Sequence, residues 1–236
     1  MSQEKKSSQI SQAVIMAAGR GQRMAPLTDY LPKPMAPLWG STLIAHGIKN
    51  LSQCISQIHI TVGYRKAALA SHVIESGAAS VFCTEGHGNA WWLYHTLLKH
   101  LDQPIYVLTC DNISRLDFDL LEQAYFEMHA PACMLVPVKP VAGLEGDYIF
   151  HHNGVVLRLS RQEPADIYCS GIQILNPAQL NRLTNVCEDF SEVWAQLIAQ
   201  RQLTVSKVYP KQWISIDTSA QLESLSSNVA NFNNYT

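Results

Sequence analysis

The sequence has little charge and no long hydrophobic run. Only 15% of its 236 residues are charged and the formal net charge is −2, which gives no reason to expect a surface that binds nucleic acid. Its apolar runs are far shorter than the ~18–20 residues that cross a bilayer. Residues 1–12 are polar, with a pair of lysines, and lack the apolar stretch of a signal peptide. We therefore expect a cytoplasmic protein that binds neither nucleic acid nor membrane.

Cysteine and histidine occur without the spacing of a metal site. The six cysteines, at positions 54, 83, 110, 133, 169 and 187, form no C-x-x-C pair, and most lie in apolar, strand-like runs. A reduced, buried cysteine behaves as a small hydrophobic residue, so we expect neither a disulfide framework nor a structural metal. His151-His152 precede Asn153-Gly154, a hairpin-turn signal that favours an exposed pair of histidines over metal ligands.

Apolar strands alternate with helical patterns in the first part of the chain. An apolar fraction of 47% over 236 residues suits one domain with a substantial core. The expected strands span 13–18, 58–62, 80–83, 105–109 and 132–138, and the expected helices span 42–51 (with Ser41 as N-cap), 66–75, 89–100 and 117–128. This alternation predicts a mainly parallel sheet covered on both faces, with a ligand beyond the carboxyl ends of the strands.

The later part of the chain has a different pattern. Residues 147–150 and 155–159 alternate like a hairpin. Further strands are expected at 168–175, 203–208 and 213–216, and helices at 177–183, 190–200 and from Ser219 onward. There is no internal repeat and no linker, so we expect a smaller lobe built onto the same sheet. Residues 226–236 are rich in Asn and Ser and are expected to fray.

A glycine loop follows the first expected strand. Gly19 and Gly21 can adopt positive φ, and they let ligand phosphates approach the backbone N–H groups. Arg23 adds a planar donor fork for phosphate oxygens, and Lys33 adds a mobile point charge. The sequence lacks both the P-loop pattern and the third glycine of a dinucleotide fingerprint. We interpret the loop as a triphosphate site, although a basic β-turn explains the short glycine stretch equally well on its own.

Two carboxylates follow expected strands. Asp111 closes the apolar strand that begins at Ile105, and Asp217 follows the strand at 213–216. The carboxyl ends of parallel strands form the ligand edge of an α/β sheet, and Mg²⁺ prefers oxygen ligands. We therefore predict that both aspartates bind Mg²⁺. A turn at Asp111-Asn112 and a helix N-cap at Asp217 are the alternatives.

A longer string surrounds the glycine loop. It reads G-R-G-Q-R-M-A-P-L-T from Gly19 and P-K-P-M from Pro32. These residues resemble the signature of the sugar-1-phosphate nucleotidyltransferases, G-x-G-[ST]-R-[LM]-x-P-L-T followed by P-K-[PA]-[LM]. Ala18 stands where many members have glycine, and Gln22 stands where Thr or Ser is usual.

Weaker parts of this resemblance lie further along the chain. Gly88-Asn89-Ala90 looks like the Gly-Thr-Ala that lets the base approach the backbone in this family, and Asn89 could bind a base edge or cap the next helix. Arg161-Gln162-Glu163-Pro164 resembles the family's Glu-Lys-Pro without its lysine, and Ser170-Gly171-Ile172 resembles its S/A-G-[IV] strand. Ser215-Ile216-Asp217-Thr218 is similar to the E-I-D-[ST] of bacterial choline-phosphate cytidylyltransferases, in which the aspartate is the second metal ligand, with serine in place of glutamate.

The resemblance implies a fold and a reaction. The fold is a three-layer α/β, Rossmann-like nucleotidyltransferase fold with a mainly parallel sheet. A nucleotide-binding part over about 13–138 precedes a small mixed acceptor lobe over about 139–225. The reaction joins an NTP to a phosphate monoester and releases pyrophosphate, with Mg²⁺ as cofactor. A sugar 1-phosphate is the first choice of acceptor. A cytidylyltransferase for phosphocholine or a similar phospho-alcohol is the alternative, followed by a catalytically weak nucleotide-binding paralogue. The identity of the base and the oligomeric state are not predicted.

The residues and the resemblance together define a set of expected site residues. Arg23 and Lys33 are expected to be catalytic, and Asp111 and Asp217 to bind Mg²⁺. The expected nucleotide contacts are Ala17, Ala18, Gly19, Arg20, Gly21, Glu85, Gly88 and Asn89, and the expected acceptor contacts are Asn112, Glu163 and Gly171.

Overall fold

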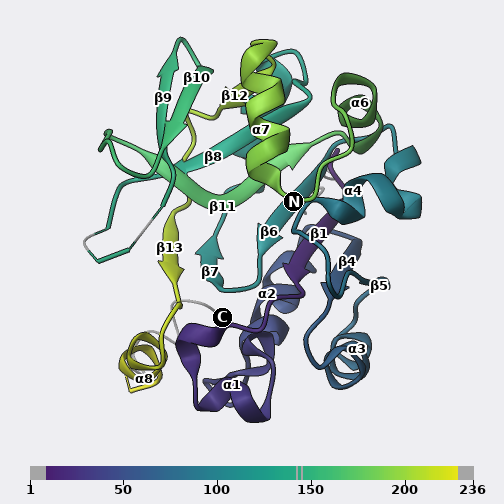
Figure 1. Cartoon of the computed structure of the whole chain (residues 1–236), viewed down its shortest axis with the longest axis vertical. Coiled ribbons are helices and arrows are strands. Elements are labelled where there is room, and N and C mark those ends of the chain that lie inside the picture. Colours follow the sequence, from purple (N-terminus) through teal and green to yellow (C-terminus); the bar gives the residue numbers. More distant parts are fainter. Residues whose placement is uncertain (1–8, 142, 145, 228–236) are drawn as a thin grey trace, which may run out of the picture.

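A nine-stranded sheet runs through the middle of the protein (Figure 1). The computed structural model describes residues 9–141, 143–144 and 146–227. The strand order is β5-β4-β1-β6-β11-β8-β12-β10-β9. The strands are β1 (Gln12–Ala17), β4 (Gln57–Val62), β5 (Ser80–Cys83), β6 (Ile105–Thr109), β8 (Cys133–Val138), β9 (Tyr148–His152), β10 (Val155–Ser160), β11 (Tyr168–Leu175) and β12 (Leu203–Val205). Only β10 and β11 run against the others, so the expected mainly parallel sheet is confirmed.

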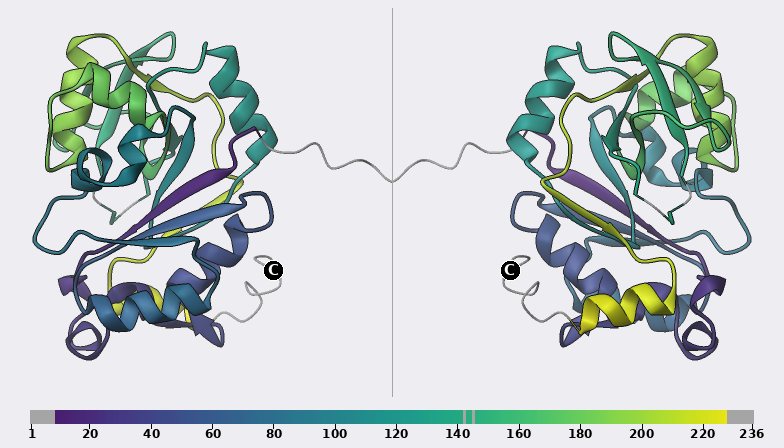
Figure 2. Two further views of the ribbon diagram at one scale, coloured as in Figure 1. Left: turned by 90° about the vertical axis from the view of Figure 1, so that its right-hand side faces the viewer. Right: turned by 90° about the vertical axis from the view of Figure 1, so that its left-hand side faces the viewer.

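Helices cover both faces of the sheet and complete three layers (Figure 2). One face packs against α2 (Leu43–Leu51), α3 (Lys66–Glu75) and α5 (Phe118–Glu127), and the other against α4 (Trp91–His95), α6 (Pro177–Leu183) and α7 (Phe190–Ala199). Alternate residues of β1 pack into the two cores on opposite faces of the sheet. Val14 faces the core with α4 and α7, whereas Ala13 and Ile15 face the core with α2 and α3.

A third, smaller core is formed by segments that follow the strands of the large sheet in the sequence. It joins α1 (Leu27–Tyr30) and the 3₁₀ turn Gln22–Met24 to α8 (Ser219–Ser226), although these segments are far apart in the sequence. A second 3₁₀ turn, Lys33–Met35, follows α1. Met24, Leu38, Ile216 and Leu222 are buried there. Two short sheets flank this core, β2 (Pro37–Leu38) with β3 (Ser41–Thr42), and β7 (Asn112–Arg115) with β13 (Gln212–Ser215).

Three local expectations need correction. Thr42, not Ser41, is the N-cap of α2, because Ser41 pairs in β3 and the Thr42 hydroxyl accepts the Ala45 N–H at 3.3 Å. The helix expected over 89–100 is interrupted at Thr96. That residue is extended, and its side chain caps a separate 3₁₀ turn, Leu97–His100. β7 is a strand that the pattern did not predict.

The polar tails are shorter than expected where the structure describes them. Ile10 is fully buried, and Glu122 of α5 accepts the N–H groups of Gln9 and Ile10 at 3.0 and 3.3 Å. Ser226 still belongs to α8. The rest of the expected tails, residues 1–8 and 228–236, lies outside the described residues. No helix within the described ranges is long and apolar enough to span a membrane.

Candidate active site

The glycine loop leaves β1 and turns tightly around Lys33. Gly21 has φ +72°, as the prediction for this loop allows, and its carbonyl accepts the hydroxyl of the buried Thr28 at 3.1 Å. A Cβ atom on Gly21 would lie 2.5 Å from Lys33 Cβ and 2.8 Å from Lys33 Cδ. Glycine is therefore required here for two reasons, the backbone conformation and the close approach of the Lys33 side chain.

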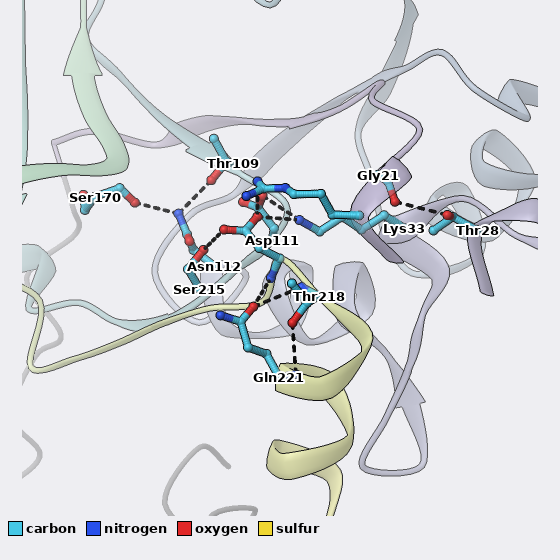
Figure 3. A network of polar contacts seen from close by, with 12 residues as sticks. Gly21, Thr28, Lys33, Thr109, Asp111, Asn112, Ser170, Ser215, Thr218 and Gln221 are labelled. Carbon is cyan, nitrogen blue, oxygen red and sulfur yellow. Dashed lines mark hydrogen bonds and ion pairs between the residues drawn. The ribbon is translucent and has the colours of Figure 1, made fainter. Parts of the chain in front are cut away.

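Lys33 lies between two carboxylates (Figure 3). Its Nζ donates to Asp111 Oδ2 at 2.9 Å and to Asp217 Oδ1 at 3.2 Å, and its side chain is only 9% exposed. Burial lowers the pKa of Lys33, but the charge and hydrogen bond of Asp111, with a smaller contribution from Asp217, outweigh this and raise the pKa above its ordinary value. The ammonium group therefore stays charged at neutral pH.

The pairing of β7 with β13 brings the two aspartates together. Ser215 of β13 pairs with Asn112 of β7 in antiparallel register, and the Ile216 N–H donates to the Asp111 carbonyl at 2.9 Å. Asp111 precedes β7 and Asp217 follows β13, so both side chains reach Lys33 Nζ from the same end of this small sheet.

The Asp217 side chain does not cap the helix that follows it. Thr218 is the N-cap of α8, and it forms a capping box with Gln221 (Figure 3). The Asp217 carboxylate instead accepts from Arg23 Nη2 at 2.9 Å as well as from Lys33. The alternative of an N-cap at Asp217 is thereby excluded.

These groups line one cleft of about 690 Å³ at the carboxyl ends of β1, β5 and β6. Among the expected site residues, the cleft wall contains Ala18, Gly19, Gly21, Arg23, Lys33, Glu85, Gly88, Asn89, Asp111 and Asp217. The cleft lies beyond the carboxyl ends of the parallel strands, the edge at which a ligand is expected in such a sheet.

Five expected site residues do not line this cleft. The Ala17 N–H donates to Thr61 Oγ1 inside the sheet, and the Arg20 guanidinium pairs with Asp29 at 2.7 Å. Asn112 donates to Thr109 Oγ1 at 2.7 Å and to the Ser170 carbonyl at 2.6 Å, directly against the backbone of Gly171. Glu163 is exposed and pairs with Arg158 at 2.6 Å. The structure does not bring these three expected acceptor residues, Asn112, Gly171 and Glu163, to the cleft.

The loop after β5 is tied to the start of α7. The Gly88 and Asn89 N–H groups donate to the carboxylates of Glu188 and Asp189 at 2.8 and 3.2 Å. The Asn89 side-chain oxygen accepts the Phe190 N–H at 2.8 Å, so Asn89 caps α7 rather than its own helix. Asp189 also lines the cleft. No motif in the sequence pointed to Asp189, because its place depends on a contact that spans 100 residues.

Similar solved structures show what class of fold this is. The inositol-1-phosphate CTP transferase from T. maritima has a TM-score of 0.78 at 14% identity, covering 94% of this chain and 96% of that chain. CTP:phosphocholine cytidylyltransferase from Streptococcus pneumoniae has a TM-score of 0.71 at 19% identity, covering 92% and 98%. The fold is therefore that of nucleotidyltransferases, as the resemblance implied.

A family model described as a MobA-like NTP transferase domain matches residues 13–170, more than half of the chain. The chain belongs to this family. It is 28% identical over 210 residues to a mannose-1-phosphate guanyltransferase from Candida albicans, covering 80% of this chain and 57% of that protein. It is 37% identical over 60 residues to the bifunctional protein GlmU of Methanococcus maripaludis, covering 25% of this chain and 15% of that protein. The matched segments thus span only part of the length of these relatives.

Proposed function

We propose that this protein transfers a nucleotidyl group from an NTP to a phosphate monoester, with a sugar 1-phosphate as the first choice of acceptor. A phosphate oxygen of the acceptor attacks the α-phosphorus, the bond from the α-phosphorus to the bridging oxygen breaks, and pyrophosphate leaves. The enzyme forms no covalent bond in this reaction, so catalysis consists of positioning and charge stabilisation. The observation that carries the proposal is the convergence of the glycine loop, Arg23, Lys33 and two aspartates on one cleft.

The positions of the cations suggest their roles. Arg23 is 64% exposed at the cleft, so its guanidinium can turn to the β- and γ-phosphates beside the N–H groups of Gly19 and Gly21. Lys33 is buried deeper, between the carboxylates, where it can neutralise the α-phosphate and the attacking phosphate. These interactions require both side chains to exchange a carboxylate partner for phosphate oxygens.

The two carboxylates fit the chemistry of Mg²⁺. Asp111 Oδ2 and Asp217 Oδ1 both lie within hydrogen-bond distance of the same Nζ atom, so both can reach a single cation. Mg²⁺ is usually held by one or two carboxylates together with substrate phosphates. Within the described ranges there is no group of three or more His, Cys, Asp or Glu side chains around a metal position, so the nucleotide would supply further ligands. When bound, the metal would offset the negative charge of the triphosphate.

Pyrophosphate release tests the proposal and identifies the substrates in the same experiment. Each common NTP would be incubated with Mg²⁺ and a panel of sugar 1-phosphates plus phosphocholine. Release with one NTP and one sugar 1-phosphate is the expected result, and release with phosphocholine would identify the alternative cytidylyltransferase instead. Arg182→Ala is a suitable control, because Arg182 is an exposed arginine paired with Asp102 and does not line the cleft. If a nucleotide binds but no acceptor on the panel leads to pyrophosphate release, the proposed transfer to these acceptors is contradicted.

A further inference from the structure

One end of the cleft is formed by the loop after β5 together with Asp189. In the sheet, β4 lies between β1 and β5, so the loops that follow β1 and β5 are two strand spacings apart, about 10 Å. Because both loops line the same cleft, a nucleotide whose triphosphate lies at the glycine loop could place its base beside the loop after β5. We call this part of the cleft the base end; it is lined by Thr84, Glu85, Gly86, His87, Gly88, Asn89 and Asp189.

Several hydrogen-bond donors at the base end are already used. Gly88 and Asn89 donate their N–H groups to the carboxylates of Glu188 and Asp189, and Ala90 donates its N–H to the Glu188 carbonyl at 2.8 Å. These three backbone groups are therefore not available to a base while the tie to the start of α7 is intact.

Asp189 instead offers an acceptor. Its Oδ1 atom receives the Asn89 N–H, whereas its Oδ2 atom receives no hydrogen bond from any described residue. The other carboxylate that lines this end, Glu85, is paired with Lys66 at 2.7 Å. An ionised carboxylate only accepts hydrogen bonds, so it attracts amino groups and repels carbonyl oxygens. Guanine, cytosine and adenine carry an exocyclic amino group, whereas uracil and thymine carry carbonyl oxygens in its place.

We propose that Asp189 is a specificity-determining residue that accepts a hydrogen bond from the amino group of the base. The cleft would then select an amino-bearing base against uracil and thymine. This inference rests on the proposed function, because it requires that the cleft binds an NTP. Guanine gains most, since its ring N–H and its amino group lie side by side: Oδ2 can accept one of them, and Oδ1 keeps a second lone pair for the other beside the Asn89 N–H.

His87 gives the base end a stacking surface that does not discriminate between bases. Its ring lies 4.3 Å from that of Trp91 at an interplanar angle of 14°, and Trp91 stacks in turn on His95 at 4.5 Å. The His87 side chain is 41% exposed and lines the cleft. Every base has a face that can stack on such a ring, so His87 would add affinity while Asp189 determines which base is chosen.

Calorimetric titration of the full chain with GTP, CTP, ATP, UTP and dTTP, with Mg²⁺ and without acceptor, tests the inference. We expect at least one amino-bearing NTP to bind about tenfold or more tightly than UTP and dTTP. Asp189→Asn keeps an oxygen for the Asn89 N–H and can place an NH₂ donor where Oδ2 was, so this preference should be lost or reversed. His87→Ala should weaken the binding of all five nucleotides by similar factors. Asp102→Asn, an exposed carboxylate away from the cleft, is the matched control.

The possible results separate this inference from the proposed function. If UTP or dTTP binds as tightly as every amino-bearing NTP, or if Asp189→Asn leaves the ranking unchanged, the role of Asp189 is wrong while nucleotidyl transfer stands. If none of the five nucleotides binds, both are wrong. Should Asp189→Asn fail to fold by its melting curve, Asp189→Ser replaces it. Serine is a favoured residue at the N-cap of α7, the position that Asp189 occupies, and the ranking is then read from that variant.

Discussion

The two walls of the cleft are built in different ways. One wall, which we call the strand-end wall, consists of the loops that directly follow the parallel strands β1, β5 and β6, and it holds Lys33 and Asp111. The other, the returning wall, consists of Asp189 and Asp217, which reach the cleft through contacts with residues about 100 positions earlier in the chain. A wall of strand ends can be located from sequence pattern, whereas a wall made by long-range pairing depends on the folded structure.

Removing a charge from either wall gives the largest expected effect and tests whether the walls matter equally. Asp111→Asn, Asp217→Asn and Lys33→Ala should each fold and lose about 10²–10³ in turnover, because each removes a charge that the proposed reaction places beside the phosphates or their Mg²⁺. Pyrophosphate release measures the loss. Glu163→Gln should lose far less, since Glu163 is exposed and paired with Arg158 away from the cleft. Near-normal turnover in Asp217→Asn would mean that the returning wall is only structural.

Gly21→Ala should disturb the strand-end wall in two ways, through the backbone conformation at position 21 and through a new contact with Lys33. The positive φ of Gly21 costs an alanine about 1–2 kcal/mol, and the new Cβ would push against Lys33, so stability and turnover should both fall. Urea unfolding and pyrophosphate release measure the two effects. Gly40→Ala is the matched control, because Gly40 has φ +77° but its Cβ would meet nothing within 4 Å. If the two variants lose turnover equally, the contact with Lys33 does not explain the loss in Gly21→Ala.

Asn89→Ala should weaken the tie between the walls. It removes the acceptor for the Phe190 N–H, which should cost about 1 kcal/mol of stability and also loosen the loop that lines the cleft. Asn176→Ala removes a similar cap outside the cleft, since Asn176 accepts the Gln179 N–H at 3.0 Å and also donates to Asp102 at 3.0 Å. Both variants should lose similar stability in urea, but only Asn89→Ala should lower nucleotide affinity. The same affinity loss in Asn176→Ala would contradict a specific role for the tie.

The smallest expected effect concerns the sheet beneath the strand-end wall. His59 of β4 is buried between Ser80 and Gln12, at 2.8 and 3.0 Å, and burial lowers its pKa below the ordinary value. A lowered histidine pKa means that the unfolded chain binds the proton first, so the stabilising contribution of neutral His59 is present above about pH 6.5 and is lost as the pH falls.

Urea unfolding at pH 7.5 and pH 5.5 measures this contribution, which cannot exceed about 1.4 kcal/mol per pH unit for one group. His59→Gln should flatten the change in stability between the two pH values. His100→Gln, at an exposed position, should leave it as in the wild type. An unchanged slope in His59→Gln would show that other groups cause the acid sensitivity.

The sequence predicts most of the fold because its strands are marked by local pattern. β6 and β11 were predicted at their observed bounds, since β6 is a mainly apolar run and β11 is rich in apolar and β-branched residues. β7 was missed because Asn112–Arg115 is short and polar except for Ile113, and it is a strand only through its pairing with β13. Pairing partners cannot be read from one strand alone.

The residues of the candidate site likewise fall into those with a local sequence signal and those placed by long-range contacts. Gly21, Lys33 and Asp111 were found because glycines, cations and a strand-end carboxylate carry their own signals. Asp189 and the partner of Asn89 were not found, because a carboxylate before an ordinary amphipathic helix has no distinguishing pattern. Glu163 was proposed from its resemblance to a motif, and in the structure it pairs with Arg158 outside the cleft.

The small sheet of β7 and β13 has a consequence for how the protein responds to mild denaturation. Only four residue pairs join its strands, and Asp217 reaches Lys33 through this sheet. A two-stranded sheet is marginally stable by itself, and this one packs through Ile113 and Ile214 on the third core, so the sheet and that core can open together in local fluctuations that leave the nine-stranded sheet closed. The carboxylate pair would then separate in denaturant before the global transition, and the protein would lose its active arrangement while still folded.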